Sequence, residues 1–394
     1  MYKARNILLI GKDPALFGAQ AGLGDSRERH MRYAQLWREK GNPQGEIKII
    51  CYTNRDDHFQ KEQLGDGLEL IPTRSRCRSL FVKDAWKQIS KLKRSGWYPD
   101  LISPQTPWEE GNLAARMAKR LDARLLPQLH FDLFSRAWLK EHWSNPLRYR
   151  LGCAVLKRAD GVRVVSEALR KKVVSQLGLD PEKVIVAPVP VSIQTREDYS
   201  DKAKYKQRLG LAEGPMVLFV GRFCATKNLS LWLRVASELA GRHSAVQFVL
   251  VGEGELMAKT QLAALHAGIE HRVFFTGKIE YDRLPDYFAA ADVFLLSSSH
   301  EGYGRVVVEA GFSGVPTVST RTAGPEDLIE ENDTGLLLEC GDEQGLVDAV
   351  RDLVQDASLR RAMGQRAWAK MRREQSPEVL EERLIQSWRS VLSA

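Results

Sequence analysis

The chain has 394 residues, of which 43% are hydrophobic and 27% charged, and it contains no low-complexity block or fixed-period repeat. This balance is typical of a folded globular protein, and the length favours two domains over a single core. The five cysteines are scattered and form no C-x-x-C pair, so neither a disulfide framework nor a zinc site is indicated.

The net charge of +8 is unevenly distributed. Residues 1–190 contain 34 Lys and Arg against 21 Asp and Glu, whereas the rest of the chain contains 24 against 29. The first half is therefore expected to face a negatively charged partner. Nucleic acid is a weak candidate, because no zinc finger, helix-turn-helix or basic motif with interleaved aromatic residues accompanies the charge.

The N-terminal region offers one short apolar run, residues 7–10, before Lys12 and Asp13. This run is too short for a signal peptide, and no apolar stretch in the chain reaches the length of a membrane span. We therefore expect a cytoplasmic protein.

In the first half, apolar runs alternate with amphipathic stretches of helical length, which predicts a doubly wound, mainly parallel sheet. Gly22 and Gly24 lie in a loop before a helix expected over about residues 26–40. Ligands of such sheets bind beyond the carboxyl ends of the strands, so we expect this loop to face a ligand, with a plain flexible turn as the alternative. The predicted strands are residues 7–10, 47–51, 68–71, 101–102, 125–129, 162–165 and 184–186.

Residues 74–97 combine apolar residues at helical spacing with eight basic residues. In one interpretation the apolar face packs on the sheet. In the other, the helix forms a basic amphipathic surface that contacts anionic lipid headgroups. Both interpretations stay open at this point.

His130 follows the predicted strand 125–129 and therefore lies where ligands gather. A lone histidine is more often structural, so position alone does not assign it a function. Asp132, two residues later, is the expected partner of its ring.

Pro188 and Pro190 mark a linker, so we place the first domain at residues 1–190. A second α/β series follows and predicts a second Rossmann-like domain over residues 191–375. Residues 376–394 are expected to form a helix that crosses back to the first domain. The predicted strands of the second series are residues 217–220, 246–251, 273–275, 293–296, 315–318 and 336–338.

Residues 292–316 predict a strand, a tight turn with Gly302 and Gly304, and a helix beginning near Val306. Such a turn presents backbone N–H groups at the positive end of the helix dipole, which suits a phosphate. Glu301 and Glu309 bracket the turn. If both were helical they would lie roughly 12 Å apart, wider than the roughly 5–9.5 Å of a glycosidase pair, and this spacing suits the two ends of an elongated ligand such as a nucleotide-sugar.

The run from Glu301 to Gly304, followed by Glu309-Ala310 and by residues 314–318, resembles the E-x7-E signature of family 4 retaining glycosyltransferases of the GT-B fold. The resemblance extends in order over most of the chain. It implies two Rossmann-like doubly wound domains that face each other across a cleft.

The resemblance also implies roles for individual residues. Arg222 and Lys227 would clamp the donor diphosphate together with the turn amides, and Glu301 and His130 would contact the sugar. Fixed cations stabilise a leaving diphosphate without a divalent ion, so no metal and no cofactor is expected. The further donor-binding residues implied are Gly22, Gly24, Gly252, Lys278, Ile279, Gly302, Tyr303, Gly304, Arg305 and Glu309.

The implied function is transfer of a hexosyl-type group from a nucleotide-sugar to a saccharide or lipid-linked saccharide, with retention of anomeric configuration. A nucleotide-sugar epimerase on the same fold is the alternative, and a non-catalytic sensor is a weaker one. A nicotinamide-dependent oxidoreductase is disfavoured because residues 11–14 supply no G-x-G-x-x-G after the first strand. Peripheral contact with the inner face of an anionic membrane remains an open expectation.

Overall fold

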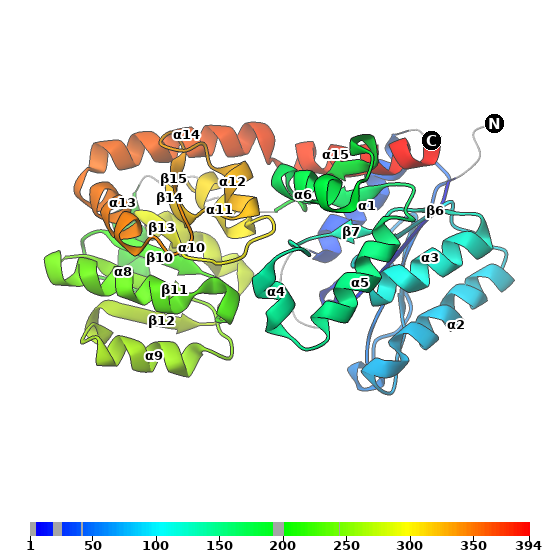
Figure 1. Cartoon of the computed structure of the whole chain (residues 1–394), viewed down its shortest axis with the longest axis horizontal. Coiled ribbons are helices and arrows are strands. Elements are labelled where there is room, and N and C mark those ends of the chain that lie inside the picture. Colours follow the sequence, from blue (N-terminus) through cyan, green and yellow to red (C-terminus); the bar gives the residue numbers. More distant parts are fainter. Residues whose placement is uncertain (1–4, 19–25, 41, 192–200, 244) are drawn as a thin grey trace. The chain divides into compact units, whose positions relative to one another are not determined.

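A computed structural model describes residues 5–18, 26–40, 42–191, 201–243 and 245–394. The chain divides into two compact units, shown with their elements in Figure 1. Unit 1 comprises Met1–Pro190 and Glu378–Ala394, and unit 2 comprises Val191–Pro377. Each unit is built around a parallel sheet with helices.

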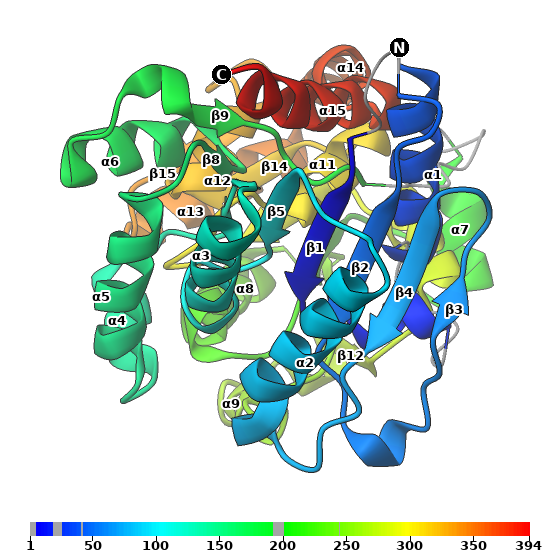
Figure 2. The same cartoon turned by 90° about the vertical axis from the view of Figure 1, so that its right-hand side faces the viewer.

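The main sheet of unit 1 has the strand order β3-β4-β2-β1-β5-β6 and is parallel except for the short β3, which pairs antiparallel with β4. A second, three-stranded parallel sheet has the order β7-β8-β9. Figure 2 shows both sheets with α2 and α3 lying over one face of the main sheet. The strands are β1 (Ile7–Gly11), β2 (Ile47–Cys51), β3 (Glu62–Gln63), β4 (Leu68–Pro72), β5 (Leu101–Pro104), β6 (Arg124–Leu125), β7 (Gln128–Leu129), β8 (Val162–Val164) and β9 (Val184–Val186).

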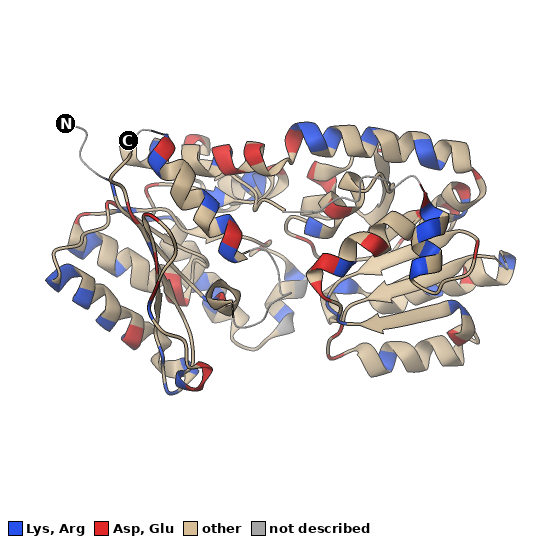
Figure 3. Ribbon diagram, turned by 180° about the vertical axis from the view of Figure 1, so that it is seen from behind, with Lys and Arg blue, Asp and Glu red and all other residues tan. Residues whose placement is uncertain are grey.

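The helix predicted within residues 74–97 is α2, and its apolar face is buried. Phe81, Ala85, Ile89 and Leu92 repeat at helical spacing and are each less than a tenth exposed, so the packing interpretation holds for these side chains. The basic residues of this segment are exposed, and Figure 3 colours Lys and Arg blue along the ribbon. The described helices of unit 1 are α1 (Ser26–Glu39), α2 (Phe81–Arg94), α3 (Glu109–Leu121), α4 (Arg136–Glu141), α5 (Asn145–Leu156), α6 (Glu167–Leu177) and α15 (Pro377–Ser393).

The single strand predicted over residues 125–129 is wrong, because the chain changes partner in its middle. Leu126 N donates to Ile102 O at 3.0 Å, and Pro127 O then accepts from Arg163 N at 3.0 Å. Proline has no N–H to continue the first ladder. The run is therefore split into β6 beside β5 and β7 beside β8.

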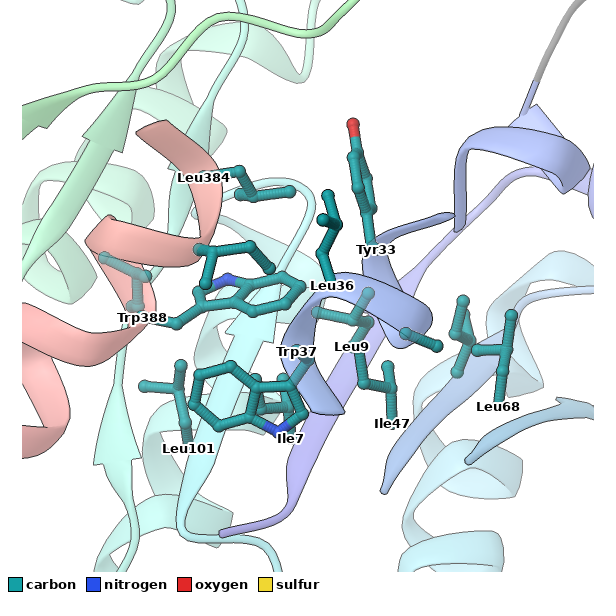
Figure 4. Close-up of a cluster of buried hydrophobic side chains, with 14 of the residues drawn as sticks. Ile7, Leu9, Tyr33, Leu36, Trp37, Ile47, Leu68, Leu101, Leu384 and Trp388 are labelled. Carbon is teal, nitrogen blue, oxygen red and sulfur yellow. The ribbon is translucent and has the colours of Figure 1, made fainter. Parts of the chain in front are cut away.

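The core of unit 1 contains a cluster of aromatic residues contributed by both ends of the chain (Figure 4). Trp388 of α15 is 1% exposed and makes edge-to-face contacts with Trp37 and Tyr33 of α1, at ring centroid distances of 5.8 and 6.3 Å. Leu384 and Ile385, on the same helix, are fully buried beside them. The last helix thus completes the core around β1.

Unit 2 contains one parallel sheet of order β12-β11-β10-β13-β14-β15. Its strands are β10 (Met216–Val220), β11 (Gln247–Val251), β12 (Val273–Gly277), β13 (Val293–Leu296), β14 (Thr317–Thr320) and β15 (Gly335–Leu338). Its described helices are α7 (Lys202–Arg208), α8 (Leu229–Arg242), α9 (Met257–His266), α10 (Leu284–Ala290), α11 (Arg305–Phe312), α12 (Ala323–Leu328), α13 (Glu343–Gln355) and α14 (Ala357–Glu374). Among the described helices of both units, none is long and apolar enough to cross a membrane.

We predict that Trp388→Ala lowers the free energy of unfolding of unit 1 by roughly 3–5 kcal/mol, because a fully buried indole is replaced by a cavity. Urea denaturation, with hydrogen exchange of the β1 amides as the local readout, measures the loss. Trp143→Ala is the matched control, since this indole is 86% exposed, and its effect should stay within about 0.5 kcal/mol. Equal effects of the two substitutions would contradict the role given to α15.

Candidate functional site

The strand order of unit 2 defines where a ligand can bind. β10 and β13 are neighbours, although β11 and β12 lie between them in the chain. In parallel α/β sheets such a switch point leaves a crevice beyond the carboxyl ends of the strands, where ligands bind. The loops after β10 and β13, residues 221–228 and 297–304, therefore form the candidate site.

Hydrogen bonds tie these two loops together. Ser297 Oγ is 3.0 and 3.1 Å from the carbonyl oxygens of Lys227 and Asn228, and Ser299 N donates to Thr226 O at 2.9 Å. Ser297 is fully buried. The backbone around Lys227 is thus fixed by the loop that follows β13.

The side chains of two predicted site residues contact one another. Lys227 Nζ lies 2.5 Å from Glu301 Oε2, and the two side chains are only 15% and 17% exposed. Ser298 Oγ lies 3.5 Å from the same carboxylate oxygen. Arg222, five residues before Lys227, is exposed. A cation and a carboxylate therefore meet at the switch point, with a second cation on the same loop.

The glycine turn that was expected to hold an anion lies at the start of α11. Gly304 adopts a left-handed conformation with φ of 84°, and no described side chain caps the helix. Gly302, Tyr303 and Gly304 are all buried. Tyr303 Oη donates to Gln375 Oε1 at 2.9 Å, and a Cβ on Gly324 would lie 2.1 Å from Tyr303 O, so the turn is closely packed from two sides.

The structure corrects one assumption about the two glutamates. Glu301 precedes α11 and only Glu309 is helical, so the helical spacing of roughly 12 Å does not apply to them. Glu309 is 5% exposed and is therefore not a solvent-facing helix residue. Arg305, at the first helical position, is half-buried.

The turns after β11 and β12 pack against the loop after β10. Gly252 N donates to Gly277 O at 3.0 Å, and a Cβ on Gly252 would lie 1.9 Å from Gly221 O. Its φ of 133° is also disfavoured for residues with a side chain. Lys278 is exposed and Ile279 half-buried next to this turn.

In unit 1, His130 follows β7, and its ring contacts Gln128. His130 Nε2 is 3.1 Å from Gln128 Oε1. The predicted partner of the ring, Asp132, is wrong: this carboxylate accepts from Lys172 Nζ at 2.7 Å and from Phe134 N at 2.9 Å. The carboxylate is therefore occupied by a lysine and a turn amide.

The ring of His130 borders a small cavity of about 50 Å³. Burial, together with the nearby Arg163 and Arg29 cations, lowers the pKa of His130 to about 3. Burial and Arg29 likewise lower the pKa of His30 to about 4. The cavity is also lined by Gln105, Gln128 and Tyr33. Of these polar residues the sequence indicated only His130. Gln128 could also have been found, because it lies two positions before the histidine and alternate residues of an extended chain face the same side. The predicted Gly22 and Gly24 lie outside the described residues.

Two protein families match the chain, each over one unit. The family "Glycosyl transferase 4-like domain" matches residues 29–190, and "Glycosyl transferases group 1" matches residues 201–370. Each unit of the chain therefore matches a glycosyltransferase family, and the chain has the GT-B fold. The predicted fold class is confirmed by solved structures as well: sucrose-phosphate synthase from Thermosynechococcus elongatus has a TM-score of 0.81 at 18% identity, with 99% of both chains covered. Anabaena HepE in complex with UDP-glucose has a TM-score of 0.76 at 20% identity, covering 98% of this chain and 99% of that one.

Curated relatives are similar over parts of the sequence. The lipopolysaccharide core biosynthesis glycosyltransferase LpsE of Rhizobium meliloti is 35% identical over 155 residues, 39% of this chain and 44% of that protein. The 2-deoxystreptamine glucosyltransferase of Streptomyces kanamyceticus is 29% identical over 300 residues, 72% of this chain and 76% of that protein. The chain thus spans less than half of the length of LpsE. None of the relatives named here is an epimerase, so that alternative gains no support.

We predict that Gly252→Ala destabilises unit 2, because the new Cβ would overlap the Gly221 carbonyl oxygen in a disfavoured backbone conformation. The displaced loop should also weaken nucleotide binding, and thermal unfolding with and without nucleoside diphosphate measures both effects. Gly241→Ala is the control, since nothing lies within 4 Å of its Cβ position in α8. That change should be neutral or stabilise by about 0.5–1 kcal/mol. Similar melting behaviour of the two variants would contradict the close approach at Gly252.

Proposed function

We propose that the protein transfers a hexosyl group from a nucleotide-sugar to a saccharide or lipid-linked saccharide, with retention of anomeric configuration and without a metal ion. The observation that carries the proposal is the contact between Lys227 and Glu301 at the switch point of unit 2, beside the turn that begins α11. A cation, a carboxylate and a helix N-terminus together match the charge pattern of a sugar diphosphate.

In this proposal the diphosphate lies at the start of α11, where Arg222 and Lys227 supply positive charge and the amides of residues 302–305 supply donors. Glu301 accepts hydrogen bonds from sugar hydroxyls. Because Lys227 contacts Glu301, the cation that meets the phosphate also orients the carboxylate that meets the sugar. Both ends of the reacting bond are thereby held through one contact.

Further residues are proposed to bind the ribose, the nucleobase and the transferred sugar of the donor. Glu309 binds the ribose hydroxyls, and the turns with Gly252, Lys278 and Ile279 line the nucleobase. His130 in unit 1 binds a hydroxyl of the transferred sugar. Gly22 and Gly24 are proposed to meet the donor phosphate and the acceptor, which rests on the sequence alone.

The proposed chemistry is a front-face substitution. The bond between the anomeric carbon and the diphosphate oxygen breaks, the acceptor hydroxyl oxygen bonds to the same face of that carbon, and the departing diphosphate oxygen takes up the hydroxyl proton. Negative charge grows on the diphosphate as the bond breaks. Arg222, Lys227 and the α11 dipole stabilise that charge where it develops.

The activities for which the relatives are named support the class of substrate. LpsE acts in lipopolysaccharide core biosynthesis, and the Streptomyces relative is a glucosyltransferase for 2-deoxystreptamine. Anabaena HepE was solved with UDP-glucose. We extend a nucleotide-sugar donor and a saccharide-type acceptor to this chain.

A panel of nucleotides and nucleotide-sugars tests the proposal. A thermal shift identifies the donor, and incubation of that donor alone should give only slow release of nucleoside diphosphate, since no acceptor is present. Transfer to a saccharide acceptor should then continue in excess chelator. Interconversion of the sugar without acceptor would identify an epimerase, and loss of the rate with chelator would overturn metal independence.

We predict that Arg222→Ala and Lys227→Ala each lower turnover by about ten- to a hundredfold. A charge-assisted hydrogen bond contributes roughly 1.5–3 kcal/mol, and each cation meets more negative charge in the transition state than in the ground state. Because both act on one diphosphate, the double variant should differ from the sum of the single variants. Single-turnover rates, with calorimetry of diphosphate binding, separate chemistry from affinity.

Arg234→Ala is the control for that series, because its guanidinium is exposed on α8 and donates to Glu343 Oε2 at 2.7 Å. It should leave turnover within twofold, as roughly expected for a surface substitution. Near-normal turnover in both the Arg222 and Lys227 variants would show that this loop does not hold the leaving group.

We further propose a peripheral contact with anionic membranes through the basic α2 surface. Its apolar face is buried, so the contact would be electrostatic and not an insertion of the helix. The surface consists of exposed basic residues: Arg74, Arg76, Arg78, Lys83, Lys87, Lys91, Lys93 and Arg94.

We predict flotation with anionic but not zwitterionic vesicles, and loss of binding as salt rises and the Debye length falls from about 10 Å at 0.1 M to about 3 Å at 1 M. Lys83→Ser/Lys87→Ser/Lys91→Ser should reduce flotation. The control variant Lys157→Ser/Lys171→Ser/Lys183→Ser removes the same number of positive charges from other exposed sites of unit 1. This control should retain most of the flotation with anionic vesicles. Equal binding to both lipids, or to neither, removes the membrane proposal.

A further inference from the structure

The hydrogen-bond partners of the Gln128 side chain determine which of its two terminal atoms is the oxygen and which is the nitrogen. Arg163 Nη1 lies 2.9 Å from Gln128 Oε1, and a guanidinium can only donate, so the atom facing it must be the carbonyl oxygen. At the other end, Gln128 Nε2 lies 3.0 Å from Ser103 Oγ, whose own proton goes to Leu126 O at 2.7 Å. Ser103 must therefore accept from the amide. Both ends require the same orientation of the Gln128 side chain.

This orientation determines which nitrogen of His130 carries the proton. His130 Nε2 lies 3.1 Å from Gln128 Oε1, which is an acceptor, so Nε2 must be protonated and must donate. In a neutral ring the remaining nitrogen, Nδ1, then carries a lone pair. Among the residues that the structure describes, no hydrogen bond to Nδ1 is found.

The arginine at the base of the chain of hydrogen bonds is itself buried and hydrogen-bonded to the backbone. Arg163 is 4% exposed, and its Nε and Nη2 donate to the backbone oxygens of Ala187 and Pro188 at 2.7 and 3.0 Å. Gln128 is 5% exposed and Ser103 fully buried. The part of the network made by Arg163, Gln128 and Ser103 is therefore enclosed.

The electrostatic surroundings keep the ring neutral. Arg163 from β8 and Arg29 from α1 face His130, and both disfavour a second proton on the ring. His30 and Tyr33, also from α1, line the same cavity, and the low pKa of His30 means that it adds no positive charge near neutral pH. His130 therefore has one neutral tautomer over the physiological range.

We infer that Gln128, held by Arg163 and Ser103, is a positioning residue that keeps His130 in the Nε2–H tautomer, so that Nδ1 accepts a hydrogen bond from a hydroxyl of the transferred sugar. The inference rests on the proposed function and deepens it by assigning the ring as an acceptor, not as a general acid. A sugar hydroxyl is a suitable donor, whereas a sugar carboxylate or a phosphate oxygen would meet a lone pair and be disfavoured.

Nitrogen-15 correlation spectra of the full chain test the tautomer without any substrate. The chain has eight histidines, and His130→Gln identifies the signals of the ring. The expected spectrum shows protonated Nε2 and unprotonated Nδ1, unchanged between pH 8 and about 5, because the pKa is lowered to about 3. A protonated Nδ1, or titration near the ordinary value of 6.5, overturns the inference whether or not the protein transfers sugar.

Two substitutions of Gln128 test the positioning role, and one substitution of Gln88 is their control. Gln128→Met removes the acceptor at similar size, so the spectrum should show a mixture of tautomers, and turnover should fall by roughly two- to tenfold with diphosphate affinity unchanged. Gln128→Glu keeps the acceptor and should preserve Nε2–H. Its charge raises the pKa of His130, which adds an acidic limb to the pH–rate profile that the wild type lacks. Gln88→Met, a half-buried glutamine on α2, is the control.

The outcomes are distinguishable from failure of the proposed function. If the wild type shows the expected tautomer but transfers no sugar from any nucleotide-sugar, the role of Nδ1 toward a sugar is overturned together with the proposed function. If the wild type is active but Gln128→Met changes turnover and tautomer no more than Gln88→Met does, the positioning role alone is overturned. Rescue of both readouts by Gln128→Glu at neutral pH supports it.

Discussion

The hydroxyl of Ser297 lies at the point on which the candidate donor site depends. Its oxygen is within hydrogen-bond distance of two consecutive carbonyl oxygens, those of Lys227 and Asn228, and so links the loops that follow β10 and β13. This link, together with the bond from Ser299 N to Thr226 O, joins two turns that follow adjacent central strands of the sheet. With it, Lys227 and Glu301 stand on one rigid frame although 74 positions separate them in sequence. Side chains that are already held in place lose little conformational entropy when a charged ligand binds. Such preorganised groups can stabilise a charge that develops during the reaction.

The two units use buried charge in different ways. In unit 2 a cation and a carboxylate contact each other near the surface, so a bound anion would add to a balanced pair. In unit 1, Arg163 donates to backbone oxygens and to a glutamine, and its positive charge lies beside two histidine rings. The positive charge of Arg163 disfavours protonation of the two histidine rings, whereas Lys227 in unit 2 is paired with a carboxylate. A neutral imidazole is a hydrogen-bonding group of fixed polarity, which suits recognition of an uncharged sugar more than proton transfer.

Much of the fold follows from local patterns in the sequence. Short runs rich in Ile, Val and Leu predict the strands because a parallel strand covered on both faces needs apolar residues throughout, and β1, β10 and β13 are of this kind. The glycine turn before α11 was also predictable, because a left-handed residue ahead of an apolar helix is a local requirement. The division of residues 125–129 was missed, since an apolar run does not reveal that its hydrogen-bond partner changes at Pro127.

The parts of the site that sequence could not supply are those made by long-range contacts. Asp132 was a reasonable partner for His130 by proximity in the chain, yet Lys172, forty positions later, takes that carboxylate. Gln128 shows why proximity still carries information: alternate residues of a strand face the same side, so a polar residue two positions before a histidine is a candidate partner. Closeness in the sequence does not predict the contact between Gln128 and Arg163, because Arg163 reaches Gln128 only when β7 and β8 pair. The protonation state inferred for His130 therefore depends on the pairing of β7 with β8 and not on the sequence around the histidine alone.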